Sequence, residues 1–236
     1  MSDSQVVVIT GATGPAGRAA AMRFVQDGAR IALVSRDKMR LQDLGASLKI
    51  ADDRWLAVSG GLTDVSAASA VAEAVVKEWG RIDVLIHMVG GWVGGTAVVD
   101  LDHDELRGML DQHLWSTLHI VQAVVPGMIE RGFGRVIAIS SPFATDIRDK
   151  GASYAIGKAA EEVLLRTLAR EVAGSGVTAN LVLIRTIDAQ HERETAPSRK
   201  NESWTTPEEL ANTLAFLASP ASAAINGARI PLDGRG

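Results

Sequence analysis

The chain of 236 residues contains no cysteine. This absence excludes a disulfide framework, a thiolate nucleophile and any zinc or iron–sulfur site built on cysteine. Aromatic residues make up only 4% of the chain, and Tyr154 is the single tyrosine. It is therefore not one of several interchangeable core aromatics. The five histidines show no metal-ligand spacing, so we expect no metal site.

An excess of basic charge is also lacking, because 24 lysines and arginines stand against 28 aspartates and glutamates. The net charge of −4 does not provide the basic footprint of a nucleic-acid binder. No cationic stretch precedes the first apolar run, so the N-terminus does not resemble a secretory signal. Residues 114–129, the most apolar long segment, are too short and too polar for a membrane span. We expect a cytoplasmic protein.

Short β-branched apolar runs alternate with longer amphipathic segments. Strands are expected at residues 6–9, 31–34, 55–58, 84–86, 136–139 and 181–184, and helices at 15–27, 37–50, 64–79, 104–129, 153–173 and 207–218. Strands that are apolar throughout are typical of a parallel sheet covered by helices on both faces. The pattern predicts a single α/β domain over residues 1–236, with a Rossmann-type doubly wound parallel sheet.

Residues 185–205 interrupt this alternation with a long polar segment after the sixth strand. Ligands of doubly wound sheets bind beyond the carboxyl ends of strands, which favours a lid over the site. A solvated surface excursion is the alternative. Further along, Thr206-Pro-Glu-Glu209 is a capping box that predicts the start of the last helix.

A glycine-rich turn follows the first strand directly. Gly11, Gly14 and Gly17 have the spacing of a dinucleotide-binding turn, and Pro15 suits the first position of a helix. Gly11 allows the tight turn, Gly14 lets backbone N–H groups approach a pyrophosphate, and Gly17 lets the helix pack on the strand. The position between first strand and first helix favours a pyrophosphate site over a purely structural turn.

The end of the second strand is expected to meet the adenosine ribose. Sites selective for NAD place a carboxylate there, whereas a 2′-phosphate requires cations. The sequence has Ser35 and Arg36, which suit a phosphate, while Asp37 is better placed as the cap of the next helix. We therefore predict NADP(H) as the preferred cofactor, with NAD(H) as the alternative.

Tyr154 and Lys158 lie four residues apart, on one face of a predicted helix. A free phenol, with a pKa near 10, exchanges protons poorly at neutral pH, and a neighbouring ammonium favours the phenolate. Ser141 closes the fifth strand, at the edge of the sheet where chemistry is expected. These residues together predict an acid–base site in which a phenol with an adjusted pKa lies near a serine hydroxyl.

Over essentially its full length the chain resembles the short-chain dehydrogenases/reductases. The resemblance rests on Thr10–Gly17, Gly80–Ile86, Ile139–Ser141, Tyr154–Lys158 and Ile225–Gly234. It implies a sheet of about seven strands and hydride transfer at the nicotinamide. In this interpretation Tyr154 is the general acid, Lys158 binds the nicotinamide ribose and tunes Tyr154, and Ser141 holds the carbonyl oxygen. The substrate is then a small molecule.

The resemblance also implies partners and further contacts. Additional cofactor contacts fall on Thr13, Leu62, Val89, Gly90 and Ile187. Members of the family form dimers or tetramers through helices that correspond here to 104–129 and 153–173, so a homo-oligomer, such as a homotetramer, is expected.

The chain departs from the family pattern at five places, the first of which is Pro15, where most single-domain members have glycine. Gly61 stands where an aspartate accepts the adenine amino group, and His87–Gly90 replaces Asn-Asn-Ala-Gly. Ile184-Arg185 replaces Pro-Gly beside the nicotinamide. His113 replaces the asparagine of the proton relay, so it is either a relay group or a core histidine bonded to backbone.

The segment around Trp92 is similar to that of dihydropteridine reductases, in which a Tyr/Lys pair reduces a pterin ring. Trp92 would then stack on a flat substrate, or else form a hydrophobic plug at a subunit surface. The alternatives to a carbonyl reductase are thus a reductase of pterin-like C=N rings and a dinucleotide-binding sensor with little catalysis.

Overall fold

The computed structural model describes residues 4–233, and seven parallel strands form one sheet in the order β3-β2-β1-β4-β5-β6-β7. The strands are β1 (Val6–Thr10), β2 (Arg30–Ser35), β3 (Trp55–Ser59), β4 (Val84–His87), β5 (Gly134–Ser140), β6 (Val177–Leu183) and β7 (Arg229–Pro231). The strand order reverses between β1 and β4, so a crevice opens beyond their carboxyl ends. The predicted doubly wound sheet is confirmed.

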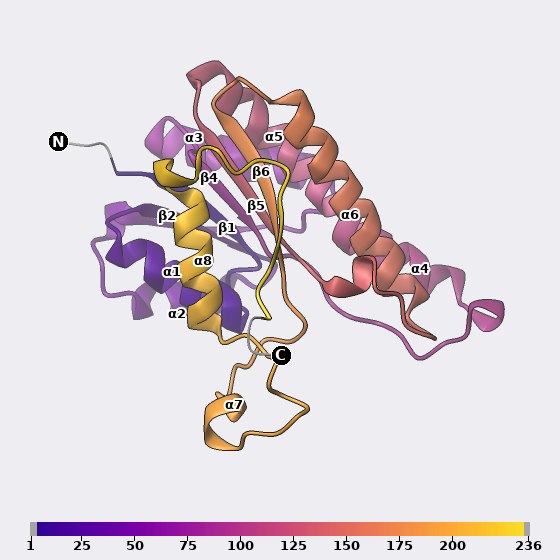
Figure 1. Ribbon diagram of the computed structural model, residues 1–236. Helices are drawn as coiled ribbons and strands as arrows, with labels where there is room; N and C mark the ends of the chain where they lie inside the picture. Colours follow the sequence, from indigo (N-terminus) through magenta and orange to yellow (C-terminus); the bar gives the residue numbers. More distant parts are fainter. Residues whose placement is uncertain (1–3, 234–236) are drawn as a thin grey trace.

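Helices cover both faces of the sheet (Figure 1). They are α1 (Pro15–Gln26), α2 (Lys38–Ser47), α3 (Val65–Trp79), α4 (His103–Leu110), α5 (Ser116–Arg131), α6 (Ala152–Glu171), α7 (Glu192–Thr195) and α8 (Pro207–Ala218). One buried apolar cluster joins α1, α2 and α8 to the sheet, and the other joins α3, α5 and α6 to the opposite face. Within β1, Val7 and Val8 belong to different clusters, which explains why the strand is apolar throughout.

The helix expected at 104–129 consists of three pieces. α4 runs into a π-helix at Asp111–Trp115, and α5 follows directly. A π-helical turn inserts one extra residue and rotates the side chains after it, and such turns are frequent at functional sites. Here it carries His113, which is buried.

The strand β6 begins four residues before the expected position. Asn180, a polar residue that obscures the strand pattern, is buried inside it. Its side chain donates a hydrogen bond to the Ile225 carbonyl (2.8 Å) and accepts one from the Ala228 N–H (3.0 Å). These partners are distant in sequence, so local patterning does not reveal them.

Two predicted helix starts are confirmed. The Asp37 carboxylate caps α2 by accepting a hydrogen bond from the Arg40 N–H at 3.1 Å. Thr206 and Glu209 form the reciprocal bonds of a capping box at the start of α8.

The polar segment after β6 is closed at its base by a parallel bridge between Ile187 and Thr205. Inside it, the buried Asp188 carboxylate accepts hydrogen bonds from the first N–H groups of α7. Arg193 joins the segment to α8 through Glu209 at 2.6 Å. In Figure 1 the segment projects from the lower edge of the molecule. Its role as a lid stays a prediction.

Among residues 4–233, no helix combines the length and the apolar character that crossing a membrane requires.

Candidate active site

The glycine turn after β1 depends on two glycines for its shape. Gly11 has φ +68°, and a Cβ there would lie 2.5 Å from the Met88 carbonyl oxygen. A Cβ on Gly17 would lie 2.5 Å from the Ala12 carbonyl oxygen. Both neighbours are backbone, which does not yield easily. The turn and the packing of α1 on it therefore explain these two positions.

Gly14 differs from Gly11 and Gly17 in its backbone conformation and in the space around it. Its φ is −75°, and a Cβ there would meet only the Gly11 carbonyl oxygen, at 3.6 Å. Gly14 is also the N-cap of α1, and no side chain caps the helix. The protein itself thus leaves the space beside Gly14 open and the first N–H groups of α1 without a side-chain partner. Such an arrangement fits an anionic pyrophosphate.

The carboxyl end of β2 combines hydroxyls with an exposed cation. The Thr13 and Ser35 hydroxyls lie 3.1 Å apart. Arg36 is exposed and forms no salt bridge within residues 4–233, while the nearby Asp37 carboxylate is engaged in capping α2.

Gly61, which follows the third strand β3, has open space beside its Cα atom. A Cβ on Gly61 would meet nothing within 4 Å. The next residue, Leu62, is buried, and its carbonyl lies 3.0 Å from His119 Nδ1. The space that an aspartate side chain would need is therefore present at Gly61.

A cavity of about 250 Å³ lies at the carboxyl ends of the central strands. It brings together many of the residues predicted from sequence, namely Val89, Gly90, Trp92, His113, Tyr154, Lys158 and Ile187. Ile184 and Arg185, noted as departures from the family pattern, line it as well. The other predicted cofactor residues lie outside this lining, on the β1–α1–β2 side and at Leu62 after β3.

A second cavity, of about 620 Å³, adjoins the first. Both are lined by Trp92, Tyr154, Arg185 and Thr186. Tyr154 therefore stands at the border between the two spaces. We refer to them below as the inner cavity (250 Å³) and the outer cavity (620 Å³).

Lys158 is buried and engaged with two protein groups. Its Nζ donates to the Ile139 carbonyl at 2.7 Å and to Glu161 Oε2 at 2.6 Å. An ammonium has three donors, so one remains for a ligand or for the phenol of Tyr154.

Glu161, the partner of Lys158, is itself fully buried, and Thr117 Oγ1 lies 3.3 Å from its Oε1. Burial raises the pKa of the Glu161 carboxyl, while the Lys158 ammonium opposes this shift.

The two serines at the end of β5 have different surroundings. The Ser140 hydroxyl donates to Glu162 Oε1 at 2.7 Å, and Arg229 holds the other oxygen of Glu162 at 2.6 Å. The Ser141 hydroxyl accepts a hydrogen bond from the Phe143 N–H at 3.3 Å. Ser140 lines the inner cavity and Ser141 does not. The assignment of Ser141 to the substrate oxygen stays a prediction.

His113 packs edge-on against the Tyr154 ring, with 5.5 Å between ring centres. Its Nε2 bonds the Gly91 carbonyl at 3.0 Å, and its buried Nδ1 has no partner within residues 4–233. A Cβ on Gly90 would lie 2.5 Å from the imidazole, and one on Gly157 would lie 3.0 Å from it. Both glycines therefore make room for this ring.

Burial lowers the pKa of His113 to about 3, the Lys158 ammonium adds to the effect, and the bond to Gly91 opposes it. The imidazole is thus neutral at neutral pH, and Nδ1 is an acceptor because Nε2 carries the proton towards Gly91. The backbone bond expected of a core histidine is present, and so is a free acceptor beside Tyr154.

His87 completes a continuous chain of hydrogen bonds beneath the site. The Thr10 hydroxyl accepts from the Met88 N–H and lies 3.0 Å from His87 Nδ1. His87 Nε2 lies 3.3 Å from the Ser116 hydroxyl, which donates to the Gln112 carbonyl. Every group is satisfied when the proton of the ring is on Nε2. Burial lowers the pKa of His87 to about 3, and Lys158 and His113 contribute, so this neutral form persists.

Sequence analysis missed the buried carboxylates Glu161 and Glu162. A signal for the first was available, because positions 154, 158 and 161 recur at the spacing of one helix face. A carboxylate at such a position is a candidate partner for Lys158. Glu162 gave no such signal, because its partners Ser140 and Arg229 come from other elements.

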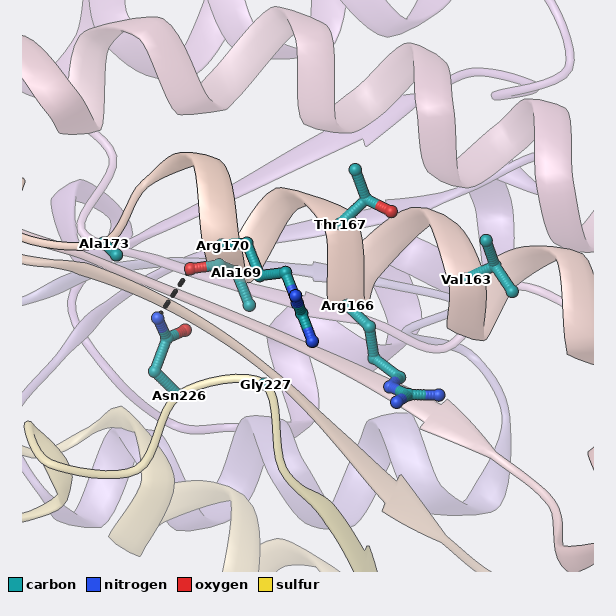
Figure 2. Close-up of a pocket in the computed structure, with 8 residues that line it drawn as sticks. All are labelled: Val163, Arg166, Thr167, Ala169, Arg170, Ala173, Asn226 and Gly227. Atoms are coloured by element: carbon teal, nitrogen blue, oxygen red, sulfur yellow. Dashed lines mark hydrogen bonds between the residues drawn. The ribbon is translucent and has the colours of Figure 1, made fainter.

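Another cavity, of about 440 Å³, lies on the outward side of α6. Figure 2 shows Arg166 and Arg170 extending from α6, with Asn226 on the loop before β7 bonded to the Ala169 carbonyl at 2.7 Å. None of the predicted site residues lines it. No group of residues within 4–233 has the composition and spacing to hold a metal ion.

Comparison with known proteins agrees with this arrangement. A cyclohexanol dehydrogenase of Rhodococcus sp. (strain TK6) is 30% identical over 256 residues, covering 98% of this chain and 95% of that protein. The (2S)-[(R)-hydroxy(phenyl)methyl]succinyl-CoA dehydrogenase subunit BbsC of Thauera aromatica is 31% identical, covering 96% of this chain and 92% of that protein.

Solved structures are similar over the same length. A short chain dehydrogenase from Bacillus anthracis superimposes with a TM-score of 0.88 at 27% sequence identity. The match covers 98% of this chain and 95% of the Bacillus anthracis chain. A 3-ketoacyl-(acyl-carrier-protein) reductase from Brucella melitensis, complexed with NADH, has the same fold with a TM-score of 0.88 at 22% identity, covering 98% of each chain. The family model for short chain dehydrogenases matches residues 5–200. The chain therefore belongs to the short-chain dehydrogenase/reductase family, a family of oxidoreductases.

Proposed function

We propose that residues 1–236 form one catalytic domain that transfers hydride between NADP(H) and a small carbonyl or alcohol substrate. The observation that carries the proposal is the position of Tyr154. It lines both the inner and the outer cavity, and Lys158 lines the inner cavity one helical turn further along α6. This arrangement supports proton exchange with a substrate oxygen in the outer cavity.

The cofactor is held by the glycine turn and by the inner cavity. The open space at Gly14 and the start of α1 receive the pyrophosphate, and Ser35 and Arg36 receive the adenosine ribose. Thr13, Pro15, Leu62, Val89 and Ile187 line the remaining path. When bound, the nicotinamide supplies or accepts the hydride.

The residues of this chain manage the proton. In reduction, Tyr154 donates its hydroxyl proton to the substrate oxygen, and in oxidation its phenolate accepts that proton. The Lys158 ammonium stabilises the phenolate by its charge and offers its third N–H to the nicotinamide ribose. Ser141 donates a hydrogen bond to the substrate oxygen. His113 offers the Nδ1 acceptor for a relay through which the phenol regains its proton.

The preference for NADP(H) rests on an exposed, unpaired Arg36 beside Ser35, with the Asp37 carboxylate engaged in capping. Fluorescence titration should give a lower Kd for NADPH than for NADH. Arg36→Gln should weaken NADPH binding and leave NADH binding unchanged. Tighter binding of NADH to the unchanged protein would contradict the preference.

A reductase of pterin-like C=N rings is the second candidate, and Trp92 favours it. This side chain is 65% exposed and lines both cavities, so an indole face is available to a flat ring. A Cβ on Gly94 would lie 2.9 Å from the indole, so glycine permits its position.

We also propose a dimer or tetramer that uses the helices at 104–129 and 153–173. The supporting observation is an apolar groove lined by Leu114, Ile156, Ala159, Ala160, Val163, Leu164 and Thr167. Ile156 and Val163 are 44% and 63% exposed on it. Light scattering should detect the oligomer, and Val163→Glu should dissociate it. A monomeric unchanged protein would contradict this assembly.

Thermal shift with NADH and NADPH, followed by absorbance assays on carbonyl and pterin panels, tests the function. Stabilisation by NADPH with turnover of carbonyls is expected. Turnover of pterins alone would favour the second candidate, and binding without any turnover would favour a dinucleotide sensor.

A further inference from the structure

A group of cationic side chains surrounds the outer cavity. A third cavity, of about 420 Å³, shares Phe143, Arg148, Arg185 and Thr186 with the outer cavity. The cations that line these two spaces are Arg148, Lys150, Arg185, Arg199 and Lys200, against the acids Asp149 and Glu202. The chain as a whole has a net charge of −4. Around these two cavities, positive charge therefore exceeds negative charge, in contrast to the chain as a whole.

These five cations lack protein counter-charges. All five are exposed, and none forms a salt bridge or a side-chain hydrogen bond within residues 4–233. Elsewhere, arginines such as Arg193 and Arg229 pair with carboxylates at 2.6 Å. A cleft lined by unpaired charge of one sign concentrates ligands of the opposite sign and speeds their association.

Arg148 and Lys150 are held in position by the loop between β5 and α6. The Arg148 guanidinium lies over the Phe143 ring, 4.3 Å from its centre, which restrains the side chain. Lys150 has φ +56°, an uncommon conformation for a residue with a side chain, and its carbonyl accepts the Gly95 N–H at 2.7 Å. Strained backbone of this kind concentrates at ligand-binding sites. The wall of the outer cavity thus has a defined shape.

Arg185 and Arg148 line different sets of cavities. Arg185 follows the end of β6 and lines the inner, outer and third cavities. Arg148 lines the outer and third cavities only. The part of the cofactor that occupies the inner cavity is thus a second ligand that Arg185 can meet, whereas Arg148 is placed for the substrate alone. Substituting Arg148 therefore distinguishes binding of the substrate from binding of the cofactor.

We propose that the substrate carries an oxyanion, a carboxylate or a phosphate, which Arg148 and Arg185 bind while Tyr154 meets the reacting oxygen. This inference rests on the proposed function and names the substrate class of that same site. A guanidinium presents a planar fork that matches such groups with two parallel hydrogen bonds. Lys150, Arg199 and Lys200 attract the anion from the rim.

The first experiment compares 2-oxo, 3-oxo and 4-oxo acids with their methyl esters, and dihydroxyacetone phosphate with dihydroxyacetone, as substrates with NADPH. At least one anion should exceed its neutral counterpart in kcat/KM by roughly tenfold to a hundredfold, the range that charged hydrogen bonds give. Raising the ionic strength should narrow the difference. Equal kcat/KM for every pair would overturn the proposal.

The variants Arg148→Gln and Arg185→Gln should raise the KM for the preferred anion, and Arg148→Gln should leave the KM of its neutral counterpart unchanged. Arg30→Gln is the matched control, because Arg30 begins β2 at the opposite end of the sheet. NADPH affinity of Arg148→Gln should equal that of the unchanged protein. Loss of NADPH affinity in Arg148→Gln, with no selective effect on anionic substrates, would assign the cations to the cofactor.

A binding measurement separates this inference from the proposed function. Titration with succinate or inorganic phosphate should change the tryptophan fluorescence, because Trp92 and Trp204 line the outer and third cavities. The change should disappear in Arg148→Gln and persist in Arg30→Gln. Arg148-dependent binding without any turnover would uphold the anion site while contradicting the oxidoreductase, and turnover without such binding would do the reverse.

Discussion

The two sides of the crevice are formed by different groups, by backbone on the β1–α1 side and by buried side chains on the α6 side. On the β1–α1 side, the shape depends on backbone, since the Gly11 and Gly17 positions are closed by the carbonyls of Met88 and Ala12. On the α6 side, it depends on buried side chains, with Lys158 paired to Glu161 and His113 against Tyr154. Each side contacts the same crevice beyond the carboxyl ends of the strands.

The two sides should differ in how they respond to substitution. A site made of backbone N–H groups does not depend on the identity of the neighbouring side chains, and at Gly61 a Cβ would meet no atom within 4 Å. A site made of buried charges needs each partner, because an unpaired buried charge is expensive. Substitutions on the α6 side should therefore impair catalysis. Substitutions on the β1–α1 side should impair folding or cofactor binding.

The largest effect is expected for Tyr154→Phe. Removing the phenolic proton should lower kcat by about 10²-fold to 10⁴-fold, the usual contribution of general acid–base catalysis. The Kd of NADPH should stay the same, because the substitution removes only a hydroxyl. A variant that keeps most of its turnover would remove Tyr154 from the reaction.

Gly17→Ala and Gly14→Ala test the backbone-built side as a pair. The first places a methyl 2.5 Å from a backbone oxygen and should lower the free energy of unfolding by about 1–3 kcal/mol. The second meets no protein atom closer than 3.6 Å, so stability should change by less than about 0.5 kcal/mol while NADPH binding weakens. Urea titration and fluorescence titration give the two values. Equal destabilisation by both variants would contradict the distinction drawn here.

The two buried histidines, His87 and His113, should make the stability of the chain depend on pH. Burial holds both pKa values near 3, below the ordinary 6.5, so the unfolded chain binds more protons between these values. The free energy of unfolding should therefore fall as pH falls below 6.5, by at most about 1.4 kcal/mol per pH unit for each histidine.

His87→Gln should reduce this slope between pH 6.5 and 5, measured by urea titration at each pH. The matched control is His103→Gln, at an exposed position at the start of α4. The raised pKa of Glu161 acts in the opposite direction above 4.5, and it is common to both variants. An unchanged slope in His87→Gln would show that His87 is not neutral in the folded chain.

The smallest effect on catalysis is expected for Glu161→Gln, which keeps a hydrogen-bond acceptor for Lys158 but removes its buried counter-charge, and therefore also lowers the free energy of unfolding. The Lys158 ammonium should then stabilise the phenolate more strongly, so the basic limb of the kcat/KM profile should move to lower pH, by roughly one unit. Glu162→Gln is the matched control, because Glu162 pairs with Arg229 instead. A shift of equal size in both variants would indicate a structural cause.

The sequence predicted what is local in this fold. The strands are apolar because both faces are covered, and the turn at Gly11–Gly17, the cap at Asp37 and the capping box at Thr206 are adjacent along the chain. The pairing of Tyr154 with Lys158 follows from helix geometry alone. Contacts of this kind leave a pattern within a few residues.

What the sequence did not predict depends on distant partners. The first residues of β6 are hidden because Asn180 is satisfied by the loop before β7. Glu162 of α6 is buried against partners from two strands, Ser140 of β5 and Arg229 of β7. The π-helix at Asp111–Trp115 has no periodic signature, since one inserted residue merely displaces the face of the helix that follows.

The single phenol of this chain has a practical consequence. Because Tyr154 lines both cavities and no second tyrosine exists, the ultraviolet difference absorption of tyrosinate reports on one atom of the crevice. A titration of the intact protein, read by light alone and without any turnover, therefore follows the proton that the reaction would move. The same signal, recorded with a ligand present, says whether that ligand favours the charged or the neutral oxygen.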